Sequence, residues 1–176
     1  YTERDQASPL GVYGASKLAG EQFILATGAN ALILRTSWVY GLHGRNFLLT
    51  ILRLAAERKE LRIVSDQVGS PTSANAIANA TAQLIQQYDT KQSLPTGVYH
   101  MTAEGSTSWH GFAEAIVGAT SRGSAPRVTA ILTAEYPTPA RRPKNSVLAN
   151  DKFLSAFGFR LKPWRQQLQE VLAEQA

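Results

Sequence analysis

One segment, residues 31–40 (Ala-Leu-Ile-Leu-Arg-Thr-Ser-Trp-Val-Tyr), restricts the fold of this chain more than any other. It begins as an unbroken apolar run and becomes polar and aromatic before Gly41. Such a run is typical of a parallel strand buried on both faces, and ligands bind where the carboxyl ends of parallel strands open onto a crevice. We therefore expect an α/β fold with a doubly wound parallel sheet and a ligand site near residues 36–40.

The segments around this strand alternate between helical and extended patterns. Residues 9–28 predict a helix, because Pro9 stands near the start, no proline interrupts residues 12–26, and Gly28 can end the helix. Apolar spacing and capping residues predict the next elements: helix 46–59, strand 61–64, helix 73–88 capped by Ser73, strand 98–101, and a helix capped by Ser108 that includes residues 112–117. Four prolines predict that residues 122–146 are mostly extended or loop, and helices near 150–156 and 163–173 complete the chain.

Composition excludes several classes of function. The chain has no cysteine, which removes disulfides, thiolate metal sites and cysteine nucleophiles, and its three histidines lack metal-ligand spacing, so we expect no metal site. The sequence contains no run of about 18 apolar residues, so we expect no membrane span. Residues 1–5 lack the pattern of a secretion signal. The net charge of +5 arises entirely after residue 119, but the charges are scattered and do not form a dense stripe. We therefore expect a small anionic ligand or a solvated surface, not nucleic acid.

Tyr13 and Lys17 are the first residues that suggest chemistry. They stand four positions apart on the predicted first helix and so share one face. A nearby positive charge favours the phenolate form of tyrosine, which makes such a pair suited to proton transfer beside a carbonyl that a nicotinamide reduces. Spacing alone is weak evidence, and an ordinary helix surface remains the alternative.

Further motifs follow the Tyr-xxx-Lys helix and the buried strand in a fixed order. In this order the chain resembles the extended short-chain dehydrogenase/reductases, whose fold is Rossmann-like, and among them the dTDP-4-dehydrorhamnose reductase family. The matching stretches are residues 1–3, 8–21, 34–41, 46–47, 66–72 and 140–146.

The resemblance implies a role for each matching residue. Tyr13 would donate the proton to the 4-keto oxygen of a dTDP-linked sugar, and Lys17 would bind the nicotinamide ribose hydroxyls and favour the phenolate. Trp38 would pack against the sugar ring and Gln67 would hydrogen-bond the nucleotide or sugar. The remaining predicted contacts are Thr36, Ser37 and Val39 near the nicotinamide of NADPH or NADH, and Asn46 and Arg142 at the diphosphate.

Plainer interpretations of the substrate residues stay open. A core tryptophan is the less favoured alternative for Trp38, and a plain proline-containing turn is the alternative for residues 66–72. Asn46 would serve as a helix cap, and Arg142, with Arg141 beside it, as a solvated loop charge.

The glycine-rich turn that holds the pyrophosphate in this family does not precede Tyr13. We therefore expect this chain to be a C-terminal portion, in which residues 1–60 complete a dinucleotide-binding domain. Residues 61–176 would be mainly substrate-binding, interleaved with a returning strand near 97–102. Alone, the chain should bind dinucleotide poorly and expose the edge of strand 31–36, so that it pairs with another chain or rearranges its first helix.

The function that the resemblance implies is reduction of dTDP-4-dehydro-L-rhamnose to dTDP-L-rhamnose in the cytoplasm, by an enzyme for which a homodimer is one arrangement. A nucleotide-sugar epimerase or dehydratase is an alternative, but residues 37–39 and 142–146 favour the reductase. A non-catalytic regulatory subunit on the same scaffold is a second alternative, against which the presence of both Tyr13 and Lys17 argues.

Overall fold

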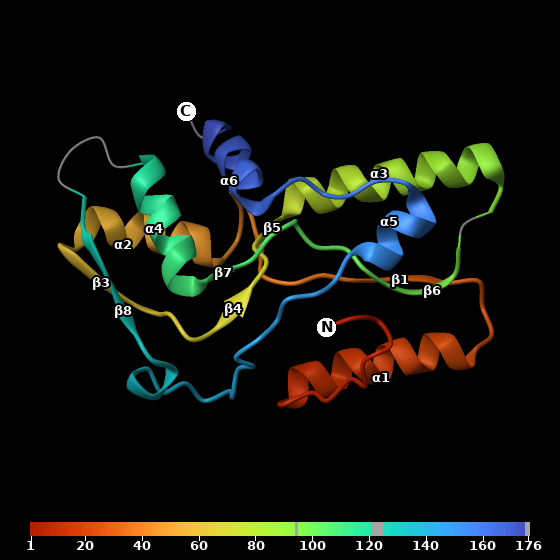
Figure 1. Ribbon diagram of the computed structural model, residues 1–176, viewed down its shortest axis with the longest axis horizontal. Coiled ribbons are helices and arrows are strands. Elements are labelled where there is room, and N and C mark those ends of the chain that lie inside the picture. The colour runs from red at the N-terminus through yellow and green to blue at the C-terminus, as the bar shows by residue number, and fades with distance from the viewer. Residues whose placement is uncertain (94, 121–124, 175–176) are drawn as a thin grey trace.

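The computed structural model describes residues 1–93, 95–120 and 125–174, and it has the α/β architecture that the sequence predicts (Figure 1). The predicted helices are present, with ends shifted by at most three residues. The elements in chain order are α1 (Val12–Ala26), β1 (Leu32–Arg35), β2 (Val39–Tyr40), α2 (Phe47–Glu57), β3 (Glu60–Val64), β4 (Val68–Gly69), β5 (Thr72–Ser73), α3 (Ala74–Lys91), β6 (Gly97–His100), β7 (Thr107–Ser108), α4 (Trp109–Thr120), β8 (Arg127–Ile131), the 3-10 helix η1 (Thr133–Glu135), α5 (Asp151–Phe157) and α6 (Trp164–Ala173).

The strands form short pairs, and most of these pairs are parallel. β1 pairs with β6, β2 with β5 and β3 with β8 in parallel, whereas β4 and β7 are antiparallel. The β1–β6 register places Arg35 opposite His100, so both strands end at the same edge. Figure 1 shows α1 along one side of this pair and α3 and α5 along the other. A parallel pair with helices on both sides confirms the predicted fold class.

The segment 31–40 differs from its prediction, because it is not one continuous strand. β1 ends at Arg35, and Trp38 has a φ of 49°, in the left-handed region. A residue in that region turns the chain out of a strand. The chain then pairs a second time, as β2 along β5.

A further difference lies in residues 122–146. β8 occupies five of these residues and pairs with the whole of β3, whereas the prolines predicted only extended or loop structure. The first residues of that prediction, 122–124, lie outside the described part of the chain.

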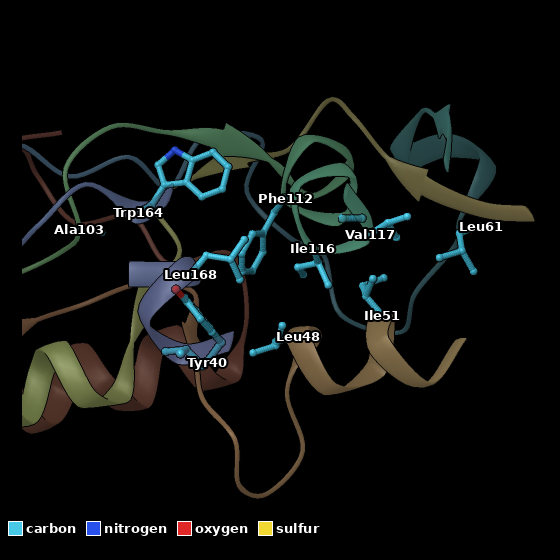
Figure 2. Close-up of a cluster of buried hydrophobic side chains, with 12 residues drawn as sticks. Tyr40, Leu48, Ile51, Leu61, Ala103, Phe112, Ile116, Val117, Trp164 and Leu168 are labelled. Carbon is cyan, nitrogen blue, oxygen red and sulfur yellow. The ribbon is translucent and has the colours of Figure 1, made fainter. Parts of the chain in front are cut away.

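Two hydrophobic clusters stabilise the elements. The larger one joins α2, β3, α4 and α6, and its core contains Leu48, Ile51, Phe112 and Leu168 (Figure 2). The smaller one lies between β6, α3 and α5, around Tyr99, Met101, Phe153 and Phe157. Each fully buried side chain of this size stabilises the fold by roughly 1.5–3 kcal/mol relative to an exposed one.

α1 belongs to neither cluster, and none of its residues is buried. Val12, Tyr13 and Phe23 are 88%, 77% and 75% exposed. Across the described ranges, no helix combines the length and apolarity that a membrane crossing requires.

Candidate active site

The Tyr13 and Lys17 side chains lie together on α1, as their spacing predicts. The Lys17 Nζ lies 5.4 Å from the centroid of the Tyr13 ring, and both residues are exposed. Between them, a Cβ added at Gly14 would lie 3.0 Å from the Cβ of Pro9, so the chain before the helix packs closely against this turn. The phenol and the ammonium are therefore neighbours that a ligand can reach.

An ion pair attaches this helix to the end of β1. The Arg35 Nε and Nη2 donate to Glu21 at 2.9 and 2.6 Å, in the two-pronged geometry that guanidinium and carboxylate favour. Glu21 holds the pKa of Arg35 above its ordinary value. Because Glu21 stands one helical turn after Lys17, the pair keeps the Tyr13–Lys17 side of α1 close to the carboxyl end of β1.

Three residues that were predicted to border the nicotinamide follow β1 directly. Thr36 is exposed and Val39 is 48% exposed. The Ser37 hydroxyl donates to the Ser70 carbonyl at 3.4 Å. All three lie at the strand end where the fold class places ligands.

Trp38 is held by an aromatic stack. Its indole lies parallel to that of Trp109, with ring centroids 3.5 Å apart and planes 3° apart. A Cβ at Gly69 would lie 2.3 Å from Trp38 Cε2, so only glycine leaves room for this indole. No local pattern in the sequence indicates a role for Trp109, because its stacking partner Trp38 lies far away along the chain.

Gln67 is 6% exposed, and both ends of its amide are used within the protein. Its Oε1 accepts from Trp109 Nε1 at 3.2 Å, and its Nε2 donates to Thr133 Oγ1 at 3.1 Å. The predicted contact between Gln67 and a ligand would require one of these bonds to open. It stays a prediction.

Asn46 caps α2. Its Oδ1 accepts from Leu49 N at 3.2 Å, and its Nδ2 donates to the carbonyls of Gly41 and His43 at 2.9 and 3.2 Å. Of its two open interpretations, this geometry favours the cap.

A cavity of about 460 Å³ lies between Leu10, in the segment just before α1, and the basic loop that carries Arg142. Its lining residues, all of them described, include no carboxylate: Leu10, Thr133, Tyr136, Pro137, Thr138, Pro139, Ala140, Arg141, Arg142 and Lys144. Lys144 approaches Asp66 at 3.7 Å, outside this lining. Three cations around one hollow favour an anionic ligand such as a diphosphate.

His100 is a buried titratable residue that the sequence did not single out. It is 1% exposed, and its Nδ1 lies 3.9 Å from Glu3 Oε1, which also accepts from the His100 backbone N–H at 2.8 Å. Burial lowers the pKa of His100, and the Glu3 carboxylate opposes part of this shift. Within the described ranges, no group of three or more potential metal ligands exists.

The parallel strand pairs flanked by helices, with polar and aromatic residues at their carboxyl ends, define an α/β protein of the Rossmann-like class. The model of the RmlD substrate binding domain matches residues 1–176, and the chain belongs to this family.

Similar proteins agree with this family. A dTDP-4-dehydrorhamnose reductase of Burkholderia thailandensis is 48% identical over an alignment of 174 positions, which covers 94% of this chain and 58% of that protein. The crystal structure of a dTDP-4-dehydrorhamnose reductase from Bacillus anthracis in complex with NADP has a TM-score of 0.87 and 35% identity, covering all of this chain and 59% of that one. The crystal structure of a dTDP-4-dehydrorhamnose reductase from Clostridium acetobutylicum has a TM-score of 0.89 and 36% identity. The match covers 99% of this chain and 59% of that one. The chain thus spans somewhat under three fifths of their length, and the predicted resemblance is confirmed.

Proposed function

We propose that the protein containing this chain reduces dTDP-4-dehydro-L-rhamnose to dTDP-L-rhamnose with NADPH or NADH. The observation that carries the proposal is the cationic cavity, which lies between Leu10, just before the helix with Tyr13, and the loop with Arg142. A nucleotide-linked keto-sugar needs both a proton donor for its ketone and cations for its diphosphate. The names of the relatives support the same reaction.

At the reacting carbon, the proposed roles divide between two side chains. Tyr13 gives its phenolic proton to the 4-keto oxygen, and Lys17 binds the ribose hydroxyls and favours the phenolate that remains. When bound, the nicotinamide supplies the hydride that the carbon receives. Thr36, Ser37 and Val39 would border it, and the exposure of Thr36 and Val39 at the end of β1 fits this role.

At the substrate end, Trp38 would contact the sugar ring with its indole, and Arg142 would offer a fork of donors to the diphosphate. Asn46 supports the site chiefly through its cap. The proposal includes the division at residue 60 between a dinucleotide-binding and a mainly substrate-binding part. It also includes a cytoplasmic location and a homodimer.

The test is NADPH oxidation by the full-length protein in the presence of dTDP-4-dehydrorhamnose. We expect turnover by the wild type and a decrease in kcat of about 10²- to 10⁴-fold in Tyr13→Phe, since the proton donor is lost. Tyr88→Phe is a matched control, because Tyr88 is also an exposed helical tyrosine but lies on α3.

Three other outcomes would contradict the proposal. A wild-type protein that consumes the dTDP-sugar without net NADPH oxidation would be an epimerase or dehydratase. One that binds dTDP but turns over nothing would be a regulatory subunit. Full activity of Tyr13→Phe would remove Tyr13 from the proposed mechanism.

A further inference from the structure

A line of hydrogen bonds runs from Trp109 through Gln67 and Thr133 to Asp66, and we call it the Trp109–Asp66 relay. Trp109 Nε1 donates to Gln67 Oε1 at 3.2 Å, Gln67 Nε2 donates to Thr133 Oγ1 at 3.1 Å, and Thr133 Oγ1 donates to Asp66 Oδ1 at 2.6 Å. The indole can only donate and the ionised carboxylate can only accept, so the amide and the hydroxyl between them have one orientation each. The Thr133 hydrogen bonds hold the pKa of Asp66 below its usual range, which keeps that carboxylate ionised.

The first end of the relay holds Trp38, the side chain that the proposed function places beside the sugar. Trp109 stacks on Trp38 at 3.5 Å, and the close approach of Gly69 leaves the Trp38 indole little room to move. Trp109 covers one face of the Trp38 indole and Gly69 lies against the other, so the position of Trp109 sets the position of the indole edge that a ligand could contact.

The second end of the relay holds the loop on which the proposed function places the diphosphate. Thr133 begins this loop, and its backbone N–H also donates to Asp66 Oδ1 at 2.8 Å. At the far end of the loop, the Lys144 carbonyl accepts from the Val68 N–H at 2.8 Å. Both ends of the stretch that carries Arg141 and Arg142 are thus attached to residues 66–68.

We propose that Gln67 is a positioning residue that fixes the distance between the Trp38 indole and the Arg141–Arg142 loop. The inference rests on the proposed function and deepens it, since that distance decides which nucleotide diphosphate sugars reach both places at once. Gln67 is almost fully buried and does not line the cationic cavity, so it acts through Trp109 and Thr133. A rigid spacing improves binding because the ligand-bound arrangement exists beforehand.

The test compares two probes on the full-length protein: dTDP, which engages the diphosphate site alone, and dTDP-L-rhamnose, which engages both. In Gln67→Leu we expect the Kd for dTDP to rise about fivefold, as is usual when one or two hydrogen bonds are lost. We also expect the advantage of dTDP-L-rhamnose over dTDP to fall to that seen in Trp38→Phe. Gln83→Leu, an exposed glutamine on α3, should change neither value.

A second pair of variants cuts the relay at Thr133. Thr133→Val removes the hydroxyl and should reproduce both effects of Gln67→Leu, whereas Thr133→Ser keeps the hydroxyl and should restore both values. If Gln67→Leu does not fold, the comparison of Thr133→Val with Thr133→Ser still tests the inference. A general loss of stability would not change the ratio of the two affinities, and it would not be rescued selectively by serine.

Two results would overturn the inference. If the relay variants weaken one probe only, or neither, while the wild type binds both, the positioning role is wrong and the proposed function stands. If the wild type binds neither probe, the proposed function and the positioning role are both wrong.

Discussion

At the scale of single residues, Gly69 and Trp38 require one another. Trp38 adopts a left-handed φ of 49°, which costs a bulky residue of the order of 1–3 kcal/mol, and its indole then occupies the space where a Gly69 side chain would stand. The stack on Trp109 and the contact with Gly69 offset that cost.

Gly69→Ala should therefore destabilise the protein. The added Cβ would lie 2.3 Å from Trp38 Cε2, so the indole must leave its stack, at a cost of about 1–3 kcal/mol in the free energy of unfolding. Urea denaturation measures this change. Gly118→Ala is the control, because Gly118 is exposed on α4 and nothing lies within 4 Å of its Cβ position. It should stabilise the protein by up to about 1 kcal/mol. Equal stability of Gly69→Ala and the wild type would contradict the close contact.

His100 should make stability depend on pH. Because its pKa is lowered in the folded state, the unfolded chain binds a proton first as pH falls below about 6.5. Stability is thus full above that pH and declines below it, by at most about 1.4 kcal/mol per pH unit. The neighbouring Glu3 carboxylate raises the pKa of His100, and the Arg35 guanidinium lowers it.

Thermal melts between pH 7.5 and 5.5 test this dependence. His100→Gln should show a flatter profile than the wild type, whereas His43→Gln, at an exposed position, should keep the wild-type profile. Identical profiles for His100→Gln and the wild type would assign the pH dependence to other groups.

The sequence was a better guide to which motifs would carry the site residues than to the contacts that each side chain would make. Asn46 and Gln67 belong to motifs that the family resemblance identified, but their side chains are satisfied by carbonyls, a hydroxyl and an indole that only the tertiary fold brings near. Trp109 carried no local signal, since stacking depends on the approach of a distant loop.

At the scale of elements, the N-terminus of α2 depends on one side chain. Asn46 supplies the cap and also ties the turn before the helix through the carbonyls of Gly41 and His43. α2 contributes Leu48 and Ile51 to the larger cluster, so the cap supports packing as well as the helix itself.

Asn46→Ala should reduce the free energy of unfolding by about 1–2 kcal/mol, the usual cost of removing a cap. Chemical denaturation of the two proteins checks this value. Asn79→Ala, an exposed helical asparagine on α3, should be neutral or slightly stabilising. A stability for Asn46→Ala equal to the wild type would show that the cap contributes nothing, and would return Asn46 to the diphosphate interpretation.

Long periodic elements were predictable, and breaks and short pairings were not. The helices follow from apolar spacing and capping residues, as at Ser73, whose hydroxyl accepts from Ala76 N at 3.1 Å. The break at Trp38 could not be foreseen, because tryptophan has no preference for a left-handed φ and adopts it here through tertiary contacts. β8 was missed because five residues near prolines are too short a pattern, and pairing with β3 stabilises them.

At the scale of the whole molecule, α1 is attached more weakly than any other long helix of the described chain. It buries no residue, whereas α4 buries Phe112, Ala113, Ile116 and Val117. Its main anchor is the pair between Glu21 and Arg35, with side chains 17% and 26% exposed. The apolar side chains on its surface, Val12 and Phe23 among them, suit a contact with further protein.

Hydrogen exchange on the 176-residue chain should therefore be faster in α1 than in α4. Glu21→Gln should accelerate exchange in α1 alone. Glu57→Gln, which removes the more exposed Arg53–Glu57 pair from α2, should leave α1 unchanged. A monodisperse monomer with a fully protected α1 would contradict both the weak attachment and the expected association of the isolated chain.

The stack of Trp38 on Trp109 has an optical consequence. Two parallel indoles with centroids 3.5 Å apart couple their electronic transitions, so they should produce a circular dichroism signal in the near ultraviolet that separate tryptophans lack. The chain has three tryptophans, and the third, Trp164, packs instead against Phe112. The protein thus contains its own spectroscopic reporter, placed where the sugar is proposed to bind, and occupancy of that place can be followed without a label.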